Sequence, residues 1–288
     1  MQKTVTIYSV MVLILLQIFI QPSAGYAQTL LNGPQKIVID TKRDRLLVSN
    51  ANSGDIIQID NRGNQTFFIK GADFIDGMEI VGDTVYGVCS NRKIKAYSLV
   101  TRKLVADITF TGSSANYLSS VASDSSGHLF ISCPLLNEIY KMDIKNLSYS
   151  VFARGKELNK PNGILFEKER NRIVVIDDSP NSKIHAIDLA DSLVTTLLTT
   201  TFNSPDGIIR DKFGNYYVGG YYLSGIYRID SALNNVVELF FKGTTMVYPT
   251  YDEKSHSILV THYDANTWER IALSNFSITL RNHKTSKL

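Results

Sequence analysis

The sequence predicts an all-β protein, a six-bladed β-propeller built from four-stranded antiparallel blades. The first observation is a tandem repeat of about 43 residues, a length typical of propeller blades. Its clearest copies are Pro161–Ile164 (PNGI) and Pro205–Ile208 (PDGI). Weaker copies of the same landmark begin at Gln35, Asp76, Ser119 and Tyr248.

A second landmark follows each copy at a steady offset. Ile184–Asp188 (IHAID) and Ile226–Asp230 (IYRID) are two examples. Two landmarks in one register favour a propeller over a β-sandwich, because a sandwich needs no internal repeat of this period. The chain after residue 27 also lacks any long stretch with the apolar period of an amphipathic helix.

Residues 1–27 are predicted to be a secretory signal peptide. A lone positive charge, Lys3, precedes an apolar run over 10–20, and the small residues that end at Ala27 suit cleavage after that residue. The alternative is an uncleaved anchor, but the apolar run is short for a membrane span. We therefore expect a secreted or periplasmic protein that begins near Gln28 and is not stably inserted in a membrane.

Residues 28–288 are predicted to form a single propeller domain. Each repeat should contain four short strands separated by turn residues. In the fourth repeat these strands are expected at 164–166, 172–176, 183–187 and 193–198. The last repeat is expected to take its outer strand from 276–280, whereas 29–31 is too short to assign. The tail at 283–288 is expected to be disordered.

The composition suits one globular domain, which we expect to be a monomer. Apolar residues make up 44% of the chain, enough for a large core. The net charge of +3 is spread without a basic cluster, which argues against nucleic acid or an anionic membrane surface as a partner. Cys89 and Cys133 fall at similar places in neighbouring repeats, so a disulfide and two buried thiols both remain open.

The first strand of each blade lines the channel, so the residue just before that strand is predicted to lie at the mouth of the propeller channel. These six residues are Gln35, Asp76, Ser119, Asn162, Asp206 and Tyr248. Carboxylate and amide oxygens on one axis, without His or Cys, indicate a site for a hard cation such as Ca²⁺ or Mg²⁺. The alternative is that the Asn-Gly and Asp-Gly pairs are ordinary turn residues.

The turn after the second strand of each blade should reach the same face. It adds Asp178, Tyr221 and His262. We take these three residues, together with Ser119 and Tyr248, as candidates for substrate binding.

The PNGI and PDGI motifs resemble those of the gluconolactonase and senescence-marker-protein (regucalcin) family, and the likeness extends from residue 34 to about 272. The resemblance implies a divalent cation at the channel mouth, held by Asn162 and Asp206, and makes Asp206 the general base of lactone hydrolysis. Ca²⁺ is expected first, with Mg²⁺, Mn²⁺ or Zn²⁺ as alternatives. Asn116 is similar to a further Asn of the family and is a candidate for substrate binding.

The first ligand of the family is a Glu that this chain lacks. The family has Glu-Gly-Pro where this chain has Asn32-Gly33-Pro34-Gln35, so Gln35 or Asn32 occupies the position. Replacing a carboxylate by an amide lowers the negative charge of the site and should weaken cation binding. Asp76 has no counterpart in the family pattern and can supply the missing charge.

Two functions are therefore predicted. The first is a metal-dependent hydrolase of lactones or related esters, with Asp206 as base and with Gln35, Asp76, Asn162 and Asp206 as metal ligands. The second is a propeller without catalysis that binds a protein, peptide or glycan on the same face. Fold alone does not separate them.

Overall fold

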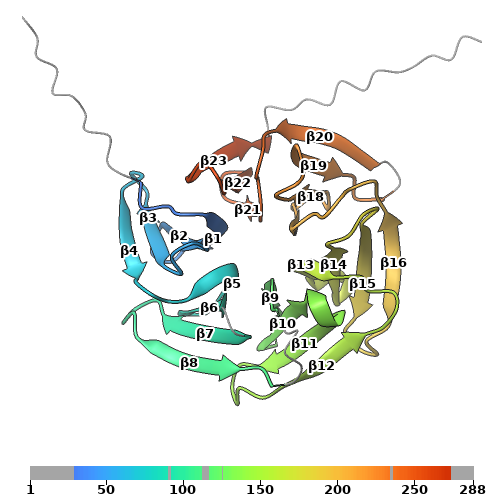
Figure 1. Cartoon of the computed structure of the whole chain (residues 1–288), viewed down its shortest axis with the longest axis horizontal. Coiled ribbons are helices and arrows are strands. Elements are labelled where there is room, and N and C mark those ends of the chain that lie inside the picture. Colours follow the sequence, from blue (N-terminus) through green and yellow to red (C-terminus); the bar gives the residue numbers. More distant parts are fainter. Residues whose placement is uncertain (1–28, 90–91, 112–116, 125, 234–235, 274–288) are drawn as a thin grey trace, which may run out of the picture.

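The computed structural model describes residues 29–273, except 90–91, 112–116, 125 and 234–235. Its strands form six antiparallel sheets that follow one another around a ring, which confirms the predicted six-bladed propeller (Figure 1). The helices of the described part are two 3-10 turns, η1 (Pro134–Leu136) and η2 (Lys168–Arg170). Neither is long and apolar enough to cross a membrane.

Each blade is built from strands that are consecutive in the sequence and paired in that order. Blades 1 to 3 contain β1 (Pro34–Asp40), β2 (Arg45–Asn50), β3 (Ile56–Asp60), β4 (Gln65–Ile69), β5 (Phe74–Val81), β6 (Thr84–Cys89), β7 (Lys93–Ser98), β8 (Leu104–Thr109), β9 (Val121–Ser123), β10 (His128–Cys133), β11 (Glu138–Asp143) and β12 (Tyr149–Arg154). Blades 4 to 6 contain β13 (Pro161–Glu167), β14 (Arg172–Asp177), β15 (Lys183–Asp188), β16 (Val194–Thr199), β17 (Gly207–Arg210), β18 (Tyr216–Gly219), β19 (Gly225–Ile229), β20 (Val236–Lys242), β21 (Thr250–Asp252), β22 (Ser257–His262) and β23 (Thr267–Ala272).

Blade 6 has three strands within the described residues. Its predicted outer strand, the predicted signal peptide and the predicted tail all lie outside that part of the chain. Residues 29–31 form no strand, but they connect blade 1 to blade 6. The Leu30 N–H donates to Gln65 Oε1 (2.7 Å), and Thr29 Oγ1 donates to the Asn266 carbonyl oxygen (3.2 Å).

Apolar side chains fill the space between neighbouring blades. Between blades 4 and 5, for example, Val174 and Ile176 of β14 pack in one cluster with Ile208 of β17. Strand β14 is apolar on both faces, because Ile173 and Val175 pack in a cluster with blade 3 whereas Val174 and Ile176 pack in the cluster with blade 5. Cys89 and Cys133 are buried in two different clusters of this kind and are free thiols, so the disulfide is not formed.

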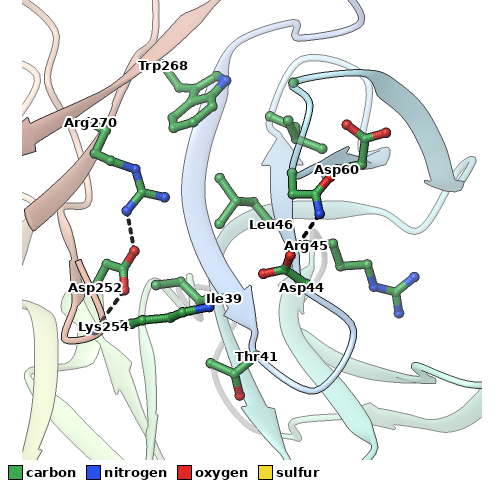
Figure 2. A pocket seen from close by; sticks show the side chains of 13 residues that line it. Ile39, Thr41, Asp44, Arg45, Leu46, Asp60, Asp252, Lys254, Trp268 and Arg270 are labelled. Atoms are coloured by element: carbon green, nitrogen blue, oxygen red, sulfur yellow. Dashed lines mark hydrogen bonds and ion pairs between the residues drawn. The ribbon is translucent and has the colours of Figure 1, made fainter.

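The seam between blades 6 and 1 contains a cavity of about 340 Å³ (Figure 2). Trp268 and Arg270 of β23 form one wall, and Ile39 and Leu46 of blade 1 lie opposite them. Arg270 is held by an ion pair with Asp252. This cavity borders the turn between β1 and β2, at the end of β1 away from the predicted channel mouth. It therefore takes no part in the predicted site.

Glycine follows the mouth residue in blades 2, 4 and 5 because the first strands approach one another too closely for a side chain. A Cβ atom on Gly163 would lie 2.6 Å from the Asp206 carbonyl oxygen, and one on Gly207 would lie 2.8 Å from Tyr248 Cα. Gly77 approaches blade 3 in the same way. None of the three has a positive φ, so they serve close approach and not a left-handed turn. This approach brings the mouth residues together.

We predict that Gly163→Ala lowers the melting temperature by roughly 2–10 °C, since overpacking costs about 1–3 kcal/mol. Ser120→Ala is the matched control, because Ser120 holds the same ring position in blade 3 and already carries a Cβ. A thermal melt in which the two variants lose equal stability would show that the close approach does not limit side-chain size.

Candidate active site at the channel mouth

One cavity of about 180 Å³ collects all six side chains that the repeat places at the mouth. These are Gln35, Asp76, Ser119, Asn162, Asp206 and Tyr248. Asp178, which follows β14, lines the same cavity, as the sequence predicted for that turn. Four lining residues were not identified from the sequence: Tyr117, Pro134, Leu135 and Lys160.

Irregular strand pairing positions three of the mouth residues. The registers of β1, β5 and β13 shift between residues 34 and 37, 74 and 78, and 161 and 164. A bulge of this kind breaks the regular alternation and re-aims a side chain. Gln35, Asp76 and Asn162 therefore lie inside strands at bulges, and not just before the strand as predicted.

Ser119 is the centre of a buried hydrogen-bond network. Its Oγ lies 2.5 Å from Asn162 Oδ1, 2.7 Å from the Tyr248 hydroxyl and 3.1 Å from Asp76 Oδ2. The Tyr248 hydroxyl also donates to Asn162 Oδ1 (2.7 Å), and the Tyr117 hydroxyl donates to Asp76 Oδ2 (2.5 Å). Except for Tyr117, these residues are at most 5% exposed.

This network holds more oxygen contacts than hydroxyl protons. The network contains five contacts of 2.5–3.1 Å. Two of them bring the hydroxyls of Tyr117 and Ser119 to Asp76 Oδ2, and two bring the hydroxyls of Ser119 and Tyr248 to Asn162 Oδ1. The fifth joins the hydroxyls of Ser119 and Tyr248. Each hydroxyl carries one proton, so three protons serve five contacts. A proton on Asp76 or a nearby cation would reduce this crowding of oxygen lone pairs.

Asp206 is oriented by two donors on opposite sides. Its Oδ2 accepts the backbone N–H of Tyr221 at 2.5 Å, and its Oδ1 accepts Asn162 Nδ2 at 3.3 Å. Burial raises the pKa of Asp206 to about 6, with a contribution in the same direction from the charge of Asp178. A carboxylate with this pKa is ionised near neutral pH and still able to accept a proton.

Asp76 is the most perturbed carboxyl group of the cavity. Burial raises its pKa to about 7, although hydrogen bonds from Tyr117, Tyr248 and Ser119 act in the opposite direction. Burial also raises the pKa of Tyr248 well above its usual value, so that hydroxyl remains protonated. Among the described side chains that contact Asp76, none is cationic. The charge of this buried carboxylate is therefore not neutralised by an ion pair.

Two residues that line the cavity each have a buried acceptor atom without a hydrogen-bond donor in the described structure, Gln35 Oε1 and Asp76 Oδ1. A buried acceptor without a donor is unfavourable. A hard cation that contacted both atoms would satisfy them, and Asp206 on the same cavity could serve as a further ligand, since carboxylate and amide oxygens suit Ca²⁺. Asn162 Oδ1 fits less directly, because two hydroxyl groups already contact it.

The described residues contain no cluster of three His, Cys, Asp or Glu side chains arranged for a metal. A cation in this cavity would therefore depend on amide and hydroxyl oxygens in addition to Asp76 and Asp206. That donor set suits Ca²⁺ better than Zn²⁺, which prefers nitrogen and sulfur ligands.

Two described candidates from the sequence do not line this cavity. Tyr221 contributes its backbone N–H to Asp206, while its ring lies against Tyr222 and Tyr263. The imidazole of His262 bonds to Glu269 on β23 (2.8 Å), which holds it along the blade. Asn116 lies outside the described residues.

The missed residues come from segments that the repeat does not describe. Tyr117 stands two positions before the mouth residue of blade 3, and Lys160 directly precedes the PNGI motif. Leu135 lies on η1, which follows the second strand of blade 3. Its place after Cys133, in the turn expected to reach this face, was the one available signal.

No protein-family model matches the chain, and no curated protein matches it in sequence. Solved structures do match in shape. A gluconolactonase from Xanthomonas campestris superposes with a TM-score of 0.69 and 14% identity, over 81% of this chain and 84% of that one. The predicted resemblance to gluconolactonases is thus confirmed at the level of the fold.

Other propellers match about as well. A catalytically inactive histidine-to-alanine variant of virginiamycin B lyase from Staphylococcus aureus gives a TM-score of 0.65 at 15% identity, over 83% of this chain and 80% of that one. A chain of a nidogen/laminin complex gives 0.60 at 16% identity, over 77% and 92%. Enzymes and a binding protein share this fold, so the site must decide the function.

We predict that, in the presence of EDTA, stability falls as the pH rises from about 4 to about 7. The folded-state pKa values of Asp76 and Asp206, about 7 and about 6, exceed the ordinary value of 3.8. The folded state therefore binds more protons in this window, and its stability is lost as they dissociate. Thermal melts of Asp76→Asn should show a smaller fall.

Asp191→Asn is the control for this experiment, because Asp191 is an exposed carboxylate in a turn of blade 4. It should keep the fall seen in the unmodified protein. Equal pH dependence of Asp76→Asn and the unmodified protein would contradict the assigned burial cost of Asp76.

Proposed function

We propose that this protein is a hydrolase of lactones or related esters that holds a divalent cation, Ca²⁺ first, in the mouth cavity. One observation carries the proposal. Gln35 Oε1 and Asp76 Oδ1 are buried without donors, and both residues line the cavity that Asp206 also lines. Asp76 thereby supplies the carboxylate that the resemblance expects from a Glu at the start of the first repeat.

The chain's own residues account for the proton transfers. Asp206 is fixed by Tyr221 and Asn162, and its pKa of about 6 suits a general base. It removes a proton from a water molecule, whose oxygen forms a bond to the carbonyl carbon. The ring C–O bond then breaks, and the protonated Asp206 returns the proton to the departing alkoxide. A bound cation would supply Lewis-acid polarisation of the carbonyl group.

The structural neighbours support the hydrolase proposal at the level of the fold. The gluconolactonase neighbour carries its activity on the same fold. The lyase neighbour is inactive when a histidine becomes alanine, whereas the described residues that line the cavity here include no His. Binding of a protein, peptide or glycan without catalysis remains the second candidate, favoured by the amide of Gln35 at the expected Glu position.

We also propose that the protein is exported to a secreted or periplasmic location and is a monomer, as the sequence predicts. A mature chain that begins at Gln28 in mass spectrometry would support export, and an intact Met1 in a membrane fraction would oppose it.

We predict that Ca²⁺ raises the melting temperature, because a ligand that binds only the folded state stabilises it. Asp206→Ala should abolish the rise by removing one carboxylate ligand. Gln35→Glu should enlarge it by adding a negative charge beside Asp76. Differential scanning fluorimetry with CaCl₂ measures all three proteins, and a smaller rise for Gln35→Glu would contradict the position assigned to Gln35.

We predict that Asp206→Asn lowers turnover of a lactone by roughly 10²–10⁴-fold, the usual contribution of a general base. The amide keeps a ligand oxygen, so the fold should persist. His262→Ala is the control and should cost far less, since His262 bonds to Glu269 outside the cavity. Steady-state kinetics in which His262 is essential and Asp206 dispensable would contradict this mechanism.

A further inference from the structure

We propose that the substrates of this site carry an apolar substituent on the lactone or ester. This substituent would pack against Tyr117 and Leu135 of blade 3, two exposed lining residues that we call the rim. This inference rests on the proposed hydrolase function. It concerns the part of the substrate outside the reacting centre, which the cation and Asp206 do not determine.

The size of the cavity limits what can enter it. Its volume is about 180 Å³, below the range of pockets that enclose drug-sized ligands. Its interior is occupied by the polar groups of Asp76, Ser119, Asn162 and Asp206. A small ring can meet these groups, but any larger substituent must extend past the rim.

On blade 3 this rim is apolar and exposed. Leu135 is 57% exposed and Tyr117 is 42% exposed, and both line the cavity. Apolar residues scattered singly over a surface are ordinary. Here two of them line the same polar cavity, so both are available to a substituent that extends out of it.

Leu135 is held in this position by a fixed turn. It is the middle residue of η1, which begins with the buried Pro134. Asn137 ends the turn in a left-handed conformation, and its N–H donates to the Pro134 carbonyl oxygen at 3.2 Å. The neighbouring Leu136 packs against the core cluster of blades 2 and 3, whereas Leu135 does not belong to it. The turn therefore presents Leu135 outward without a role in the core.

The same rim offers little to a substituent rich in hydroxyl groups. The one side-chain polar group that Tyr117 and Leu135 provide is the Tyr117 hydroxyl, and its proton is donated to Asp76 Oδ2 at 2.5 Å. Polar lining residues next to it, Lys160 and Asp178, come from blade 4. An alkyl or aryl substituent on the blade 3 side would lose water from apolar surface without leaving hydroxyl groups unpaired.

The test is a series of γ-lactones with side chains of increasing length, from γ-butyrolactone to γ-octalactone, compared with δ-gluconolactone. For the unmodified protein with CaCl₂, kcat/KM should rise by roughly 3- to 4-fold per methylene that reaches the rim. Leu135→Ser should flatten this dependence on chain length. Tyr222→Ser should not, because Tyr222 is 73% exposed on blade 5 and does not line the cavity.

The outcomes separate this inference from the proposed function. Hydrolysis of γ-lactones without dependence on chain length, or fastest turnover of δ-gluconolactone, would overturn the apolar rim and leave the hydrolase intact. A chain-length dependence that survives Leu135→Ser, in a variant with an unchanged melting temperature, would overturn the role of blade 3. No turnover of any lactone or ester with any divalent cation would overturn the hydrolase itself.

Discussion

The close approach of neighbouring first strands is the constraint on which the rest of the molecule depends. At Gly77, Gly163 and Gly207 the backbone of the next blade occupies the space of a Cβ atom. The blades can therefore close into a tight ring, and the residue before each glycine is drawn toward a common axis. The core clusters between blades stabilise the ring, but these contacts set its inner dimension and hence the spacing of the mouth residues.

That spacing has an electrostatic consequence. It crowds carboxylate, amide and hydroxyl oxygens into a cavity of about 180 Å³ with fewer protons than oxygen contacts. Burial raises the pKa of Asp76 to about 7 and that of Asp206 to about 6, so the charged forms of both carboxyl groups are disfavoured. A site that disfavours two buried negative charges is prepared for a cation, and the proposed chemistry uses that property.

The repeat was sufficient to predict the ring and the six mouth residues, because both follow from one register repeated along the chain. It did not predict Tyr117 or Leu135, which lie in segments that differ from blade to blade. It placed His262 near the mouth, but a bond to Glu269 on the next strand directs the imidazole elsewhere. Side-chain direction within a shared register depends on such local partners, and one sequence does not reveal them.

The most direct test of the central claim is anomalous diffraction from a crystal of the protein soaked with Mn²⁺. We predict a peak in the mouth cavity at about 2.0–2.6 Å from Gln35 Oε1, Asp76 Oδ1 and an Asp206 oxygen. A crystal that shows no peak in this cavity while the same three side chains are well ordered would contradict the claim that the ring of mouth residues forms a cation site.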